Sequence, residues 1–341
     1  MSTFRVGVSP DIVRPDGKLT FPSYSLEAVS FRDDVEVVDL ARTGELTPEH
    51  VADLDAVVLM LERVTPATFH TNGRLKLVAR MGVGYDTIDV PACTERDVAL
   101  TITPDAVRRP MASTIVAFVL ALAHNLFPKD RITRTGALGW PARLDYHGLG
   151  LAGRVMGSVG VGNIGADMFR LLAPFGMRMI ACDPYRDVKD VADLGVELVD
   201  LDTVFRQSDF LAFNCPLTEE TRQIGGRDGI AKMKPTSFLI NTSRGPVVDQ
   251  KALYDALVEG RLAGAALDVF DPEPPPADEP ILKLENVICA PHSLGWTDEM
   301  FRSMGEINAG AIAAVADGRD PENVVNQQVL GRAGWRAKLS G

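Results

Sequence analysis

The feature that most limits the fold is a short apolar segment that leads into a glycine-rich turn and then into an amphipathic helix. Residues 155–172 read VMGSVGVGNIGADMFRLL, so Gly160, Gly162 and Gly165 form a G-x-G-x-x-G pattern. This strand–turn–helix unit is typical of doubly wound α/β domains that bind a dinucleotide. The first glycine permits the tight turn, the second lets the backbone approach a pyrophosphate, and the third lets helix and strand pack closely.

An acidic residue follows at the distance that a ribose site requires. The expected strand 177–182 ends at Asp183, which is 23 residues past Gly160. A carboxylate about 20 residues after the turn accepts a hydrogen bond from the ribose 2′-hydroxyl, and it repels a 2′-phosphate. We therefore predict NAD as the cofactor, with NADP disfavoured and Arg186 weakening that preference. Asn163 and Ile164 complete the predicted cofactor-binding turn.

Short apolar segments alternate with helical segments along most of the chain, which predicts α/β architecture with parallel sheets. We expect one set of strands at 4–8, 35–39, 56–61 and 77–80, and a second at 155–160, 177–182, 210–214, 238–241, 264–268 and 287–290. Helices are expected at 47–54, 65–72, 111–125 and 298–317, with Pro110 as the first helical residue of the third. The proline-rich segment 271–280 reads as a rigid loop, and the tail 331–341 as either frayed or packed at an interface.

Composition narrows the class of protein. A length of 341 residues suggests two domains at about 150 residues each. There are 35 Lys and Arg against 46 Asp and Glu, and the net charge of −11 disfavours binding to nucleic acid or to anionic membranes. The longest uninterrupted apolar stretch, 115–123, has nine residues where a bilayer needs about 20, so no membrane span is expected.

The cysteines and the amino terminus indicate a compartment. Cys93, Cys182, Cys215 and Cys289 lie far apart in the chain and contain no CxxC pair. This spacing predicts neither a metal site nor disulfides and favours a reducing compartment. The first ten residues lack the apolar stretch of a secretory signal. The expected location is the cytoplasm.

Three polar residues each follow a predicted strand of the second set. They are Arg244 after 238–241, Glu273 after 264–268 and His292 after 287–290. Because the carboxyl ends of parallel strands line the ligand crevice, these side chains are expected to meet. A guanidinium can hold the carboxylate of a 2-oxo acid, and an imidazolium can give a proton to its ketone. A carboxylate beside the imidazole would orient it. Each residue alone also has a structural explanation, as a surface cation, a solvated carboxylate or a helix cap.

Several motifs together resemble the D-isomer-specific 2-hydroxyacid dehydrogenases. They are MGVGYDTID at 81–89, GVGNIG at 160–165, CPLTEETR at 215–222, NTSRGPVVD at 241–249, ALDVFDPEP at 266–274 and APH at 290–292. The resemblance covers nearly the whole chain. It implies an NAD-dependent oxidoreductase that interconverts a small 2-oxo acid and its D-2-hydroxy acid, with glyoxylate or hydroxypyruvate expected first.

The resemblance also assigns roles to residues. It places Arg244 on the substrate, makes His292 and Glu273 the acid/base pair, and sets Asp268 near the nicotinamide carboxamide. The backbone N–H groups of Val83 and Gly84 would meet the substrate carboxylate. Pro216 and Thr242 would line the cofactor cleft, or serve only as turn residues.

The family fold implies two doubly wound α/β domains. A Rossmann-type NAD-binding domain, 103–298, would be inserted into a flavodoxin-like substrate domain made of 1–102 and 299–341. The family usually forms homodimers through the cofactor domain, and the apolar helix 111–125 is the expected core of that contact. Trp140 is the candidate for an aromatic residue that reaches the site of a neighbouring subunit.

Two positions depart from the family pattern, and they leave the substrate open. Trp296 stands where small residues are usual, and it would narrow the pocket, stack on the substrate or pack in the core. Ser158 replaces an apolar residue before the glycine turn. Phosphoglycerate dehydrogenase is the alternative with a larger substrate, disfavoured because only a short tail follows 298–317. A formate dehydrogenase is disfavoured by Glu273, where that branch has Gln. An NADH-sensing interaction protein, like the corepressors of this fold, is the alternative from another class.

Overall fold

The computed structural model describes residues 3–12, 18–30, 32–70 and 73–341, and it divides into two compact units. Unit 1 comprises Met1–Val107 and Trp296–Gly341, and unit 2 comprises Arg108–Gly295. Unit 2 is thus one continuous stretch of chain, and unit 1 is made of two separate stretches. The sequence had placed the breaks at 102/103 and 298/299. The first observed break falls inside a helix, α4 (Pro104–Ala123), which an apolar pattern cannot reveal.

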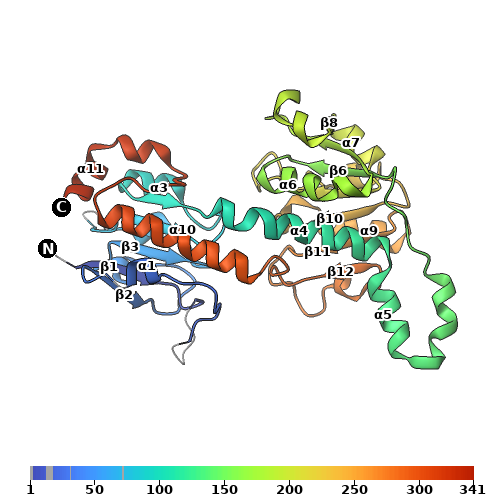
Figure 1. Cartoon of the computed structure of the whole chain (residues 1–341), viewed down its shortest axis with the longest axis horizontal. Helices are drawn as coiled ribbons and strands as arrows, with labels where there is room; N and C mark the ends of the chain where they lie inside the picture. The colour runs from blue at the N-terminus through green and yellow to red at the C-terminus, as the bar shows by residue number, and fades with distance from the viewer. Residues whose placement is uncertain (1–2, 13–17, 31, 71–72) are drawn as a thin grey trace. The chain divides into compact units, whose positions relative to one another are not determined.

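Unit 1 is built on a parallel sheet of five strands in the order β2-β1-β3-β4-β5. This is the flavodoxin-like order that was predicted. The strands are β1 (Phe4–Val8), β2 (Val35–Asp39), β3 (Ala56–Leu59), β4 (Leu77–Arg80) and β5 (Ala99–Thr101). The helices of unit 1 are α1 (Glu27–Ser30), α2 (Pro48–Val51), α3 (Val90–Glu95), α10 (Asp298–Ala316) and α11 (Ala333–Ser340). Figure 1 shows α10 lying along this sheet, and it contacts β4.

The carboxyl-terminal stretch completes unit 1. The Asn326 side chain accepts from the Leu100 backbone N–H at 2.9 Å and donates to the Val98 carbonyl at 2.9 Å, beside the edge strand β5. In α11, Trp335 is fully buried, and Lys338 Nζ donates to two backbone carbonyls of the unit. The tail was predicted to be frayed or at an interface. That prediction was wrong, because α11 packs into its own unit.

Unit 2 contains a parallel sheet of seven strands in the order β12-β11-β10-β9-β6-β7-β8. The order of the strands along the chain reverses between β6 and β9, as in the predicted Rossmann fold. The strands are β6 (Val155–Val159), β7 (Arg178–Cys182), β8 (Val196–Leu198), β9 (Phe210–Phe213), β10 (Phe238–Asn241), β11 (Gly264–Leu267) and β12 (Val287–Cys289). Its helices, besides most of α4, are α5 (Leu126–Arg134), α6 (Asn163–Leu172), α7 (Leu201–Gln207), α8 (Arg227–Ile230) and α9 (Gln250–Val258).

Both faces of the unit 2 sheet are covered, which explains why its strands read as continuous apolar segments. Successive side chains of a strand point to opposite faces. Met156 of β6 therefore packs in the cluster that includes Phe118 of α4 and Phe169 of α6. Its neighbour Val155 packs in the other cluster, with Phe205 of α7 and Leu253 of α9. The sheet is buried between two helical layers.

Helix α4 corrects the expected start of this helix. It begins at Pro104 instead of Pro110, which lies in the helix interior with its carbonyl accepting from the Ser113 and Thr114 hydroxyls. Within the described residues it is the one helix long and apolar enough to cross a membrane, although no uninterrupted apolar stretch suggested a span. Its most apolar window is 61% buried inside the protein, as in the core helix of a globular domain. Its core-facing side chains pack within unit 2, and a contact of its remaining face with a second copy stays a prediction.

After α4 the chain forms an arm, residues 126–146, which extends away from the strands of unit 2 (Figure 1). It contains α5 and two short 3-10 helices, Gly136–Leu138 and Trp140–Asp145. Five large apolar side chains of the arm are exposed, namely Leu126, Phe127, Leu138, Trp140 and Leu144. Trp140 is held beneath the Arg143 guanidinium, which lies 4.8 Å from its ring centroid.

Other differences concern short elements. The helix predicted at 65–72 is only a 3-10 turn, Pro66–Thr68, and residues 71–72 lie outside the described part. The Thr65 and Thr68 side chains accept hydrogen bonds from backbone N–H groups of this turn. The Thr–Pro pair therefore marks a capped turn that no long helix follows. Strands β5 and β8 have three residues each and were missed. The late helix, α10, agrees closely with its predicted range 298–317.

Candidate active site

The glycine turn has the geometry that its pattern predicts. Gly160 follows β6 with φ +95°, a conformation that L side chains rarely adopt. A Cβ on Gly165 would lie 3.0 Å from the Gly160 carbonyl oxygen, so this glycine is needed for close packing. A Cβ on Gly162 would meet nothing within 4 Å, so the space above this residue is open. Gly162 precedes α6, whose first two residues are the predicted Asn163 and Ile164.

Ser158 has a larger part in this turn than the sequence suggested. Its buried hydroxyl donates to the Gly160 carbonyl at 2.6 Å and accepts from the Asn214 side chain at 2.9 Å. Asn214 directly follows β9, and its backbone N–H donates to Val159 at 2.8 Å. Together they connect the ends of β6 and β9, on either side of the point where strand order reverses. The signal that could have indicated Asn214 is a polar residue directly after an apolar strand.

Asp183 is fixed beside the turn at the end of β7. Its Oδ2 accepts from the Val161 backbone N–H at 2.8 Å, and its Oδ1 accepts from Tyr185 N–H at 2.9 Å. The side chain is half-buried, and a carboxylate has further lone pairs for additional donors. The structure therefore brings Asp183 and the glycine turn together, as the spacing predicted.

The end of β10 presents Arg244 through a network of polar bonds. The Asn241 side chain donates to the Arg244 carbonyl at 2.9 Å and accepts from Ser243. The Arg244 guanidinium donates to the Ser243 carbonyl at 2.8 Å. A Cβ on the next residue, Gly245, would overlap the Phe270 carbonyl, so this segment packs directly against the loop after β11. Thr242, predicted in the cofactor cleft, is buried here.

Asp268, Glu273 and His292 come together at the ends of β11 and β12. His292 Nδ1 lies 3.0 Å from Glu273 Oε1, with the two side chains 47% and 35% exposed. Asp268 is 1% exposed, and its Oδ1 accepts from the N–H groups of Ser293 and Leu294. Burial raises the pKa of Asp268, while these backbone bonds and the nearby His292 oppose the rise.

The backbone of His292 is held in an unusual conformation. Its φ is +52°, in the left-handed region that non-glycine residues rarely occupy. The bonds from Ser293 and Leu294 to Asp268 hold the chain just after this residue. Backbone strain of this kind persists where surrounding contacts fix it, and it clusters at functional sites. Asp268 thereby sets the direction in which the imidazole is presented.

The strand register explains why these residues meet. Asn241 pairs with Leu267, and Leu267 pairs with Cys289, so β10, β11 and β12 end level with one another. Arg244, Asp268 and His292 each follow one of these ends within three residues. The predicted Pro216 lies after β9, where it is exposed and its carbonyl accepts from Thr221.

The predicted substrate residues of unit 1 lie in a turn after β4. Gly82 has φ +113°, and its N–H donates to the buried Thr103 hydroxyl at 2.9 Å. Val83 and Gly84 follow it and are both half-buried. Their contact with substrate stays a prediction. Trp296, also in unit 1, packs edge-on against Phe21 at 5.1 Å between ring centroids and remains 46% exposed.

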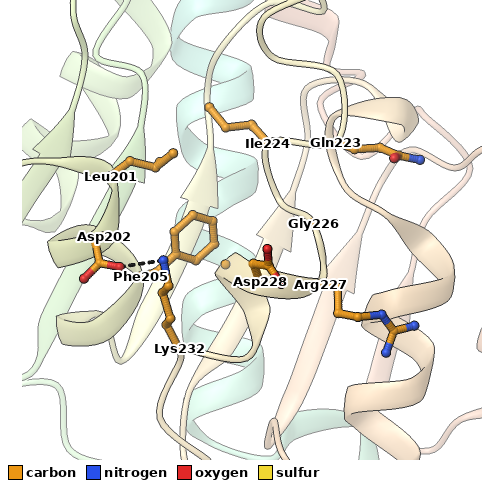
Figure 2. Close-up of a pocket in the computed structure, with 10 residues that line it drawn as sticks. Leu201, Asp202, Phe205, Gln223, Ile224, Gly226, Arg227, Asp228 and Lys232 are labelled. Carbon is orange, nitrogen blue, oxygen red and sulfur yellow. Dashed lines mark ion pairs between the residues drawn. The ribbon is translucent and has the colours of Figure 1, made fainter.

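A separate cavity of about 520 Å³ lies between α7 and α8 (Figure 2). Leu201, Phe205 and Ile224 form its apolar part, and Asp202 and Lys232 form an ion pair of 2.6 Å at its rim. Its lining contains none of the predicted site residues. The candidate site is the row of strand ends of unit 2, and this cavity between helices is distinct from it.

Comparison with known proteins identifies the family. Residues 116–293 match the model of the D-isomer specific 2-hydroxyacid dehydrogenase, NAD binding domain. This chain belongs to that family. It is therefore an oxidoreductase of D-2-hydroxyacid chemistry with NAD as its cofactor, and both predictions are confirmed.

Two curated relatives and one solved structure illustrate the similarity. The chain is 42% identical to a glyoxylate reductase of Korarchaeum cryptofilum, over 83% of this chain and 86% of that one. It is 37% identical to a D-3-phosphoglycerate dehydrogenase of Methanocaldococcus jannaschii, over 90% of this chain but 59% of that one. The crystal structure of the PH0520 protein from Pyrococcus horikoshii superposes with a TM-score of 0.79 at 26% identity, covering 98% of each chain.

The residues present fit a dinucleotide. The open space at Gly162, the start of a ten-residue helix directly after it and the Asp183 carboxylate are the features that hold a pyrophosphate and a ribose. A side chain at Gly162 would fill the space that a pyrophosphate needs.

Proposed function

We propose that this dehydrogenase reduces a small 2-oxo acid, glyoxylate to glycolate or hydroxypyruvate to D-glycerate, and uses NADH in preference to NADPH. The observation that carries the proposal is the His292–Glu273 contact of 3.0 Å at the strand end next to Arg244. The 42% identity to a glyoxylate reductase supports the substrate class. The Asp183 carboxylate supports NADH, because it would repel a 2′-phosphate.

The chain's own residues divide the chemistry among them. Arg244 binds the substrate carboxylate through its guanidinium and polarises the neighbouring carbonyl group. His292 donates a proton from Nε2 to the carbonyl oxygen, while Glu273 holds Nδ1 and stabilises the charged imidazole. Asp268 keeps the backbone of His292 in position. NADH supplies the hydride when it is bound.

The cofactor contacts belong to the turn and the strand ends of unit 2. Gly160, Gly162, Asn163, Ile164 and Gly165 hold the pyrophosphate, and Asp183 holds the adenosine ribose. Pro216 and Thr242 line the cleft. In this proposal, unit 2 is the NAD-binding domain and unit 1 is the substrate-binding domain.

A panel of 2-oxo acids with NADH and NADPH side by side tests the proposal. We expect turnover with glyoxylate or hydroxypyruvate and a higher kcat/KM with NADH. The identity to a D-3-phosphoglycerate dehydrogenase makes 3-phosphohydroxypyruvate the comparison substrate. A higher kcat/KM with that compound would replace the substrate assignment. NADH binding without turnover on any 2-oxo acid would contradict the proposal and favour an NADH-sensing role.

We also propose a homodimer formed through the arm, residues 126–146. Five exposed apolar side chains there would be covered by a second copy, and clustered apolar surface of this kind marks interaction sites. Trp140, 59% exposed, is the residue that would reach the partner. Sedimentation of the protein and of a Leu138→Asp, Leu144→Asp variant tests this, with dimer expected for the first and monomer for the second. A monomeric parent protein would overturn it.

The cytoplasm is the compartment that we propose. All four cysteines are free thiols in the structure, and they are distributed over both units. A thiol titration of the protein purified from its own cells, under conditions that block exchange, tests this. Four reactive thiols after denaturation are expected, and a disulfide would contradict it.

A further inference from the structure

A side-chain contact joins two loops next to the glycine turn, and neither residue was predicted to be in the site. The Tyr185 hydroxyl donates to Glu220 Oε2 at 3.0 Å. Tyr185 lies in the loop after β7, and Glu220 lies in the loop after β9, 35 residues further along the chain. Tyr185 is 80% exposed, so no apolar burial accounts for its position.

The contact continues a chain of hydrogen bonds that begins at the glycine turn. Val161 of the turn donates to Asp183, and the same carboxylate accepts from the Tyr185 backbone N–H. The Tyr185 hydroxyl then donates to Glu220. Because β6 lies between β7 and β9 in the sheet, this chain of bonds begins at the central strand and links the loops on either side of it.

Two residues of this chain of hydrogen bonds, Asp183 and Glu220, carry a negative charge. Asp183 is the carboxylate assigned to the adenosine ribose, and Tyr185 connects it to Glu220, with its backbone N–H on Asp183 and its hydroxyl on Glu220. The charges of both carboxylates act on the same phenol. The pKa of Tyr185 is raised first by the hydrogen bond to Glu220, then by the charge of Glu220, and also by the charge of Asp183.

We propose that Glu220, held by Tyr185, is a second specificity-determining carboxylate that rejects nucleotides with a 2′-phosphate. A 2′-phosphate at the Asp183 ribose site would bring a dianion close to Glu220 as well. Like charges in an exposed site repel over about 8 Å at physiological salt and over about 30 Å at 0.01 M, so a carboxylate in the adjacent loop contributes to discrimination. Arg186, one residue after Tyr185, opposes this effect in part. The preference between NADH and NADPH that is measured therefore includes the positive charge of Arg186 as well as the two carboxylates.

The roles of the two residues differ. Glu220 carries the charge, and Tyr185 is a positioning residue that holds the carboxylate toward the ribose site. An exposed glutamate without such a bond samples many rotamers, and its average distance from the site is larger. The proposal rests on the assignment of Asp183 to the ribose in the proposed function.

Equilibrium binding of NADH and NADPH, followed by nucleotide fluorescence, tests the proposal without any substrate. For Glu220→Gln at about 10 mM ionic strength we expect the ratio of NADPH to NADH affinity to rise about threefold to tenfold. Near 1 M salt the rise should vanish, because screening removes charge repulsion but not a structural contact. Glu219→Gln is the matched control, an equal charge change one residue away. The two variants are compared at about 0.1 M salt, where the screening length is about 10 Å, and Glu219→Gln should there have the smaller effect.

The second variant keeps the charge and removes the bond. Tyr185→Phe should raise the same ratio by less than Glu220→Gln, and Tyr185→Phe combined with Glu220→Gln should add little to Glu220→Gln alone. An unchanged ratio in Glu220→Gln at low salt, with NADH still bound, would overturn the proposal. Asp183→Asn separates the two failures, since an unchanged ratio in that variant would mean that the ribose site itself is wrongly assigned.

Discussion

The two parallel sheets each carry a glutamate just after a strand, and the two residues are used differently. Glu62 follows β3 in unit 1 and is 3% exposed. It accepts from the Ser9 hydroxyl at 2.6 Å and from the backbone N–H groups of Met60 and Leu61 at 3.1 and 3.2 Å. Glu273 follows β11 in unit 2, is 35% exposed in its side chain, and bonds the imidazole of His292.

The difference lies in the partners. The donors to Glu62 are a hydroxyl and two backbone groups, which keep their protons at any ordinary pH, so this carboxylate fixes a loop. The partner of Glu273 is the imidazole of His292, which is 47% exposed, so a ligand can reach it. In this protein, the carboxylate bound by fixed donors supports a loop, and the carboxylate bound to an exposed imidazole is placed to act in the reaction.

The largest expected effect belongs to the imidazole. His292→Ala should lower kcat with glyoxylate by about 10²–10⁴-fold, the usual contribution of general acid catalysis. NADH affinity and the melting temperature should change little, since the side chain is half exposed. Steady-state kinetics with fluorescence titration check both. Turnover near that of the parent protein would remove His292 from the mechanism.

Removing the buried carboxylate should affect stability instead. Glu62→Ala leaves the Ser9 hydroxyl and two backbone N–H groups without an acceptor in a buried place. We expect the free energy of unfolding to fall by about 2–4 kcal/mol, measured by urea denaturation. A loss below about 0.5 kcal/mol would show that water replaces the carboxylate, and the contrast between the two sheets would fail.

Glu273→Ala, the corresponding substitution in unit 2, should lower kcat and leave the free energy of unfolding nearly unchanged. Glu273→Ala removes a charge-assisted hydrogen bond worth about 1.5–3 kcal/mol when the imidazole is charged, so kcat should fall about 10–100-fold. Stability should change by less than about 0.5 kcal/mol, because the side chain is part exposed. A large loss of stability with normal kcat would instead make Glu273 a structural residue like Glu62.

The smallest expected effect concerns pH and unit 1. Burial lowers the pKa of Lys338 to about 8 from its usual 10.5. Between pH 8 and 10.5 the unfolded chain holds this proton and the folded chain does not, so stability from this group rises with pH across that range. Because the side chain is partly exposed, solvent reduces the effect, and the rise is on the order of 1 kcal/mol. Urea denaturation of the parent protein and of Lys338→Met at pH 7.5 and pH 10 measures it as the difference between the two.

The sequence predicted the strands of both sheets well because buried parallel strands appear as continuous apolar segments between turn residues. It predicted helices less well. Thr–Pro pairs begin α2 and the 3-10 turn at Pro66, and the same pair, Thr103–Pro104, begins α4. The start of α4 was nevertheless assigned to Pro110, where the apolar stretch begins. The edge strands β5 and β8 are too short to give a periodic signal.

For the candidate site, the sequence predicted which strand ends carry polar residues but not how their side chains are held. The contact of Glu273 with His292 follows from strand order and chemistry. The left-handed backbone of His292, and the bonds from Ser293 and Leu294 to Asp268, depend on how two loops pack, which no local pattern encodes. The bridge from Ser158 to Asn214 likewise needed the coordinates.

The discontinuity of unit 1 bears on how the protein is made. On a ribosome, the whole of unit 2 emerges before α10, Asn326 and α11 do, so the sheet of unit 1 still lacks these contacts at that stage. Unit 2 can therefore form its core first. The amino-terminal strands of unit 1 meanwhile have an unpaired edge at β5 and a sheet face that α10 does not yet cover. Nascent chains that stall or are cut late in translation would contain a folded unit 2 joined to an incompletely folded, aggregation-prone unit 1.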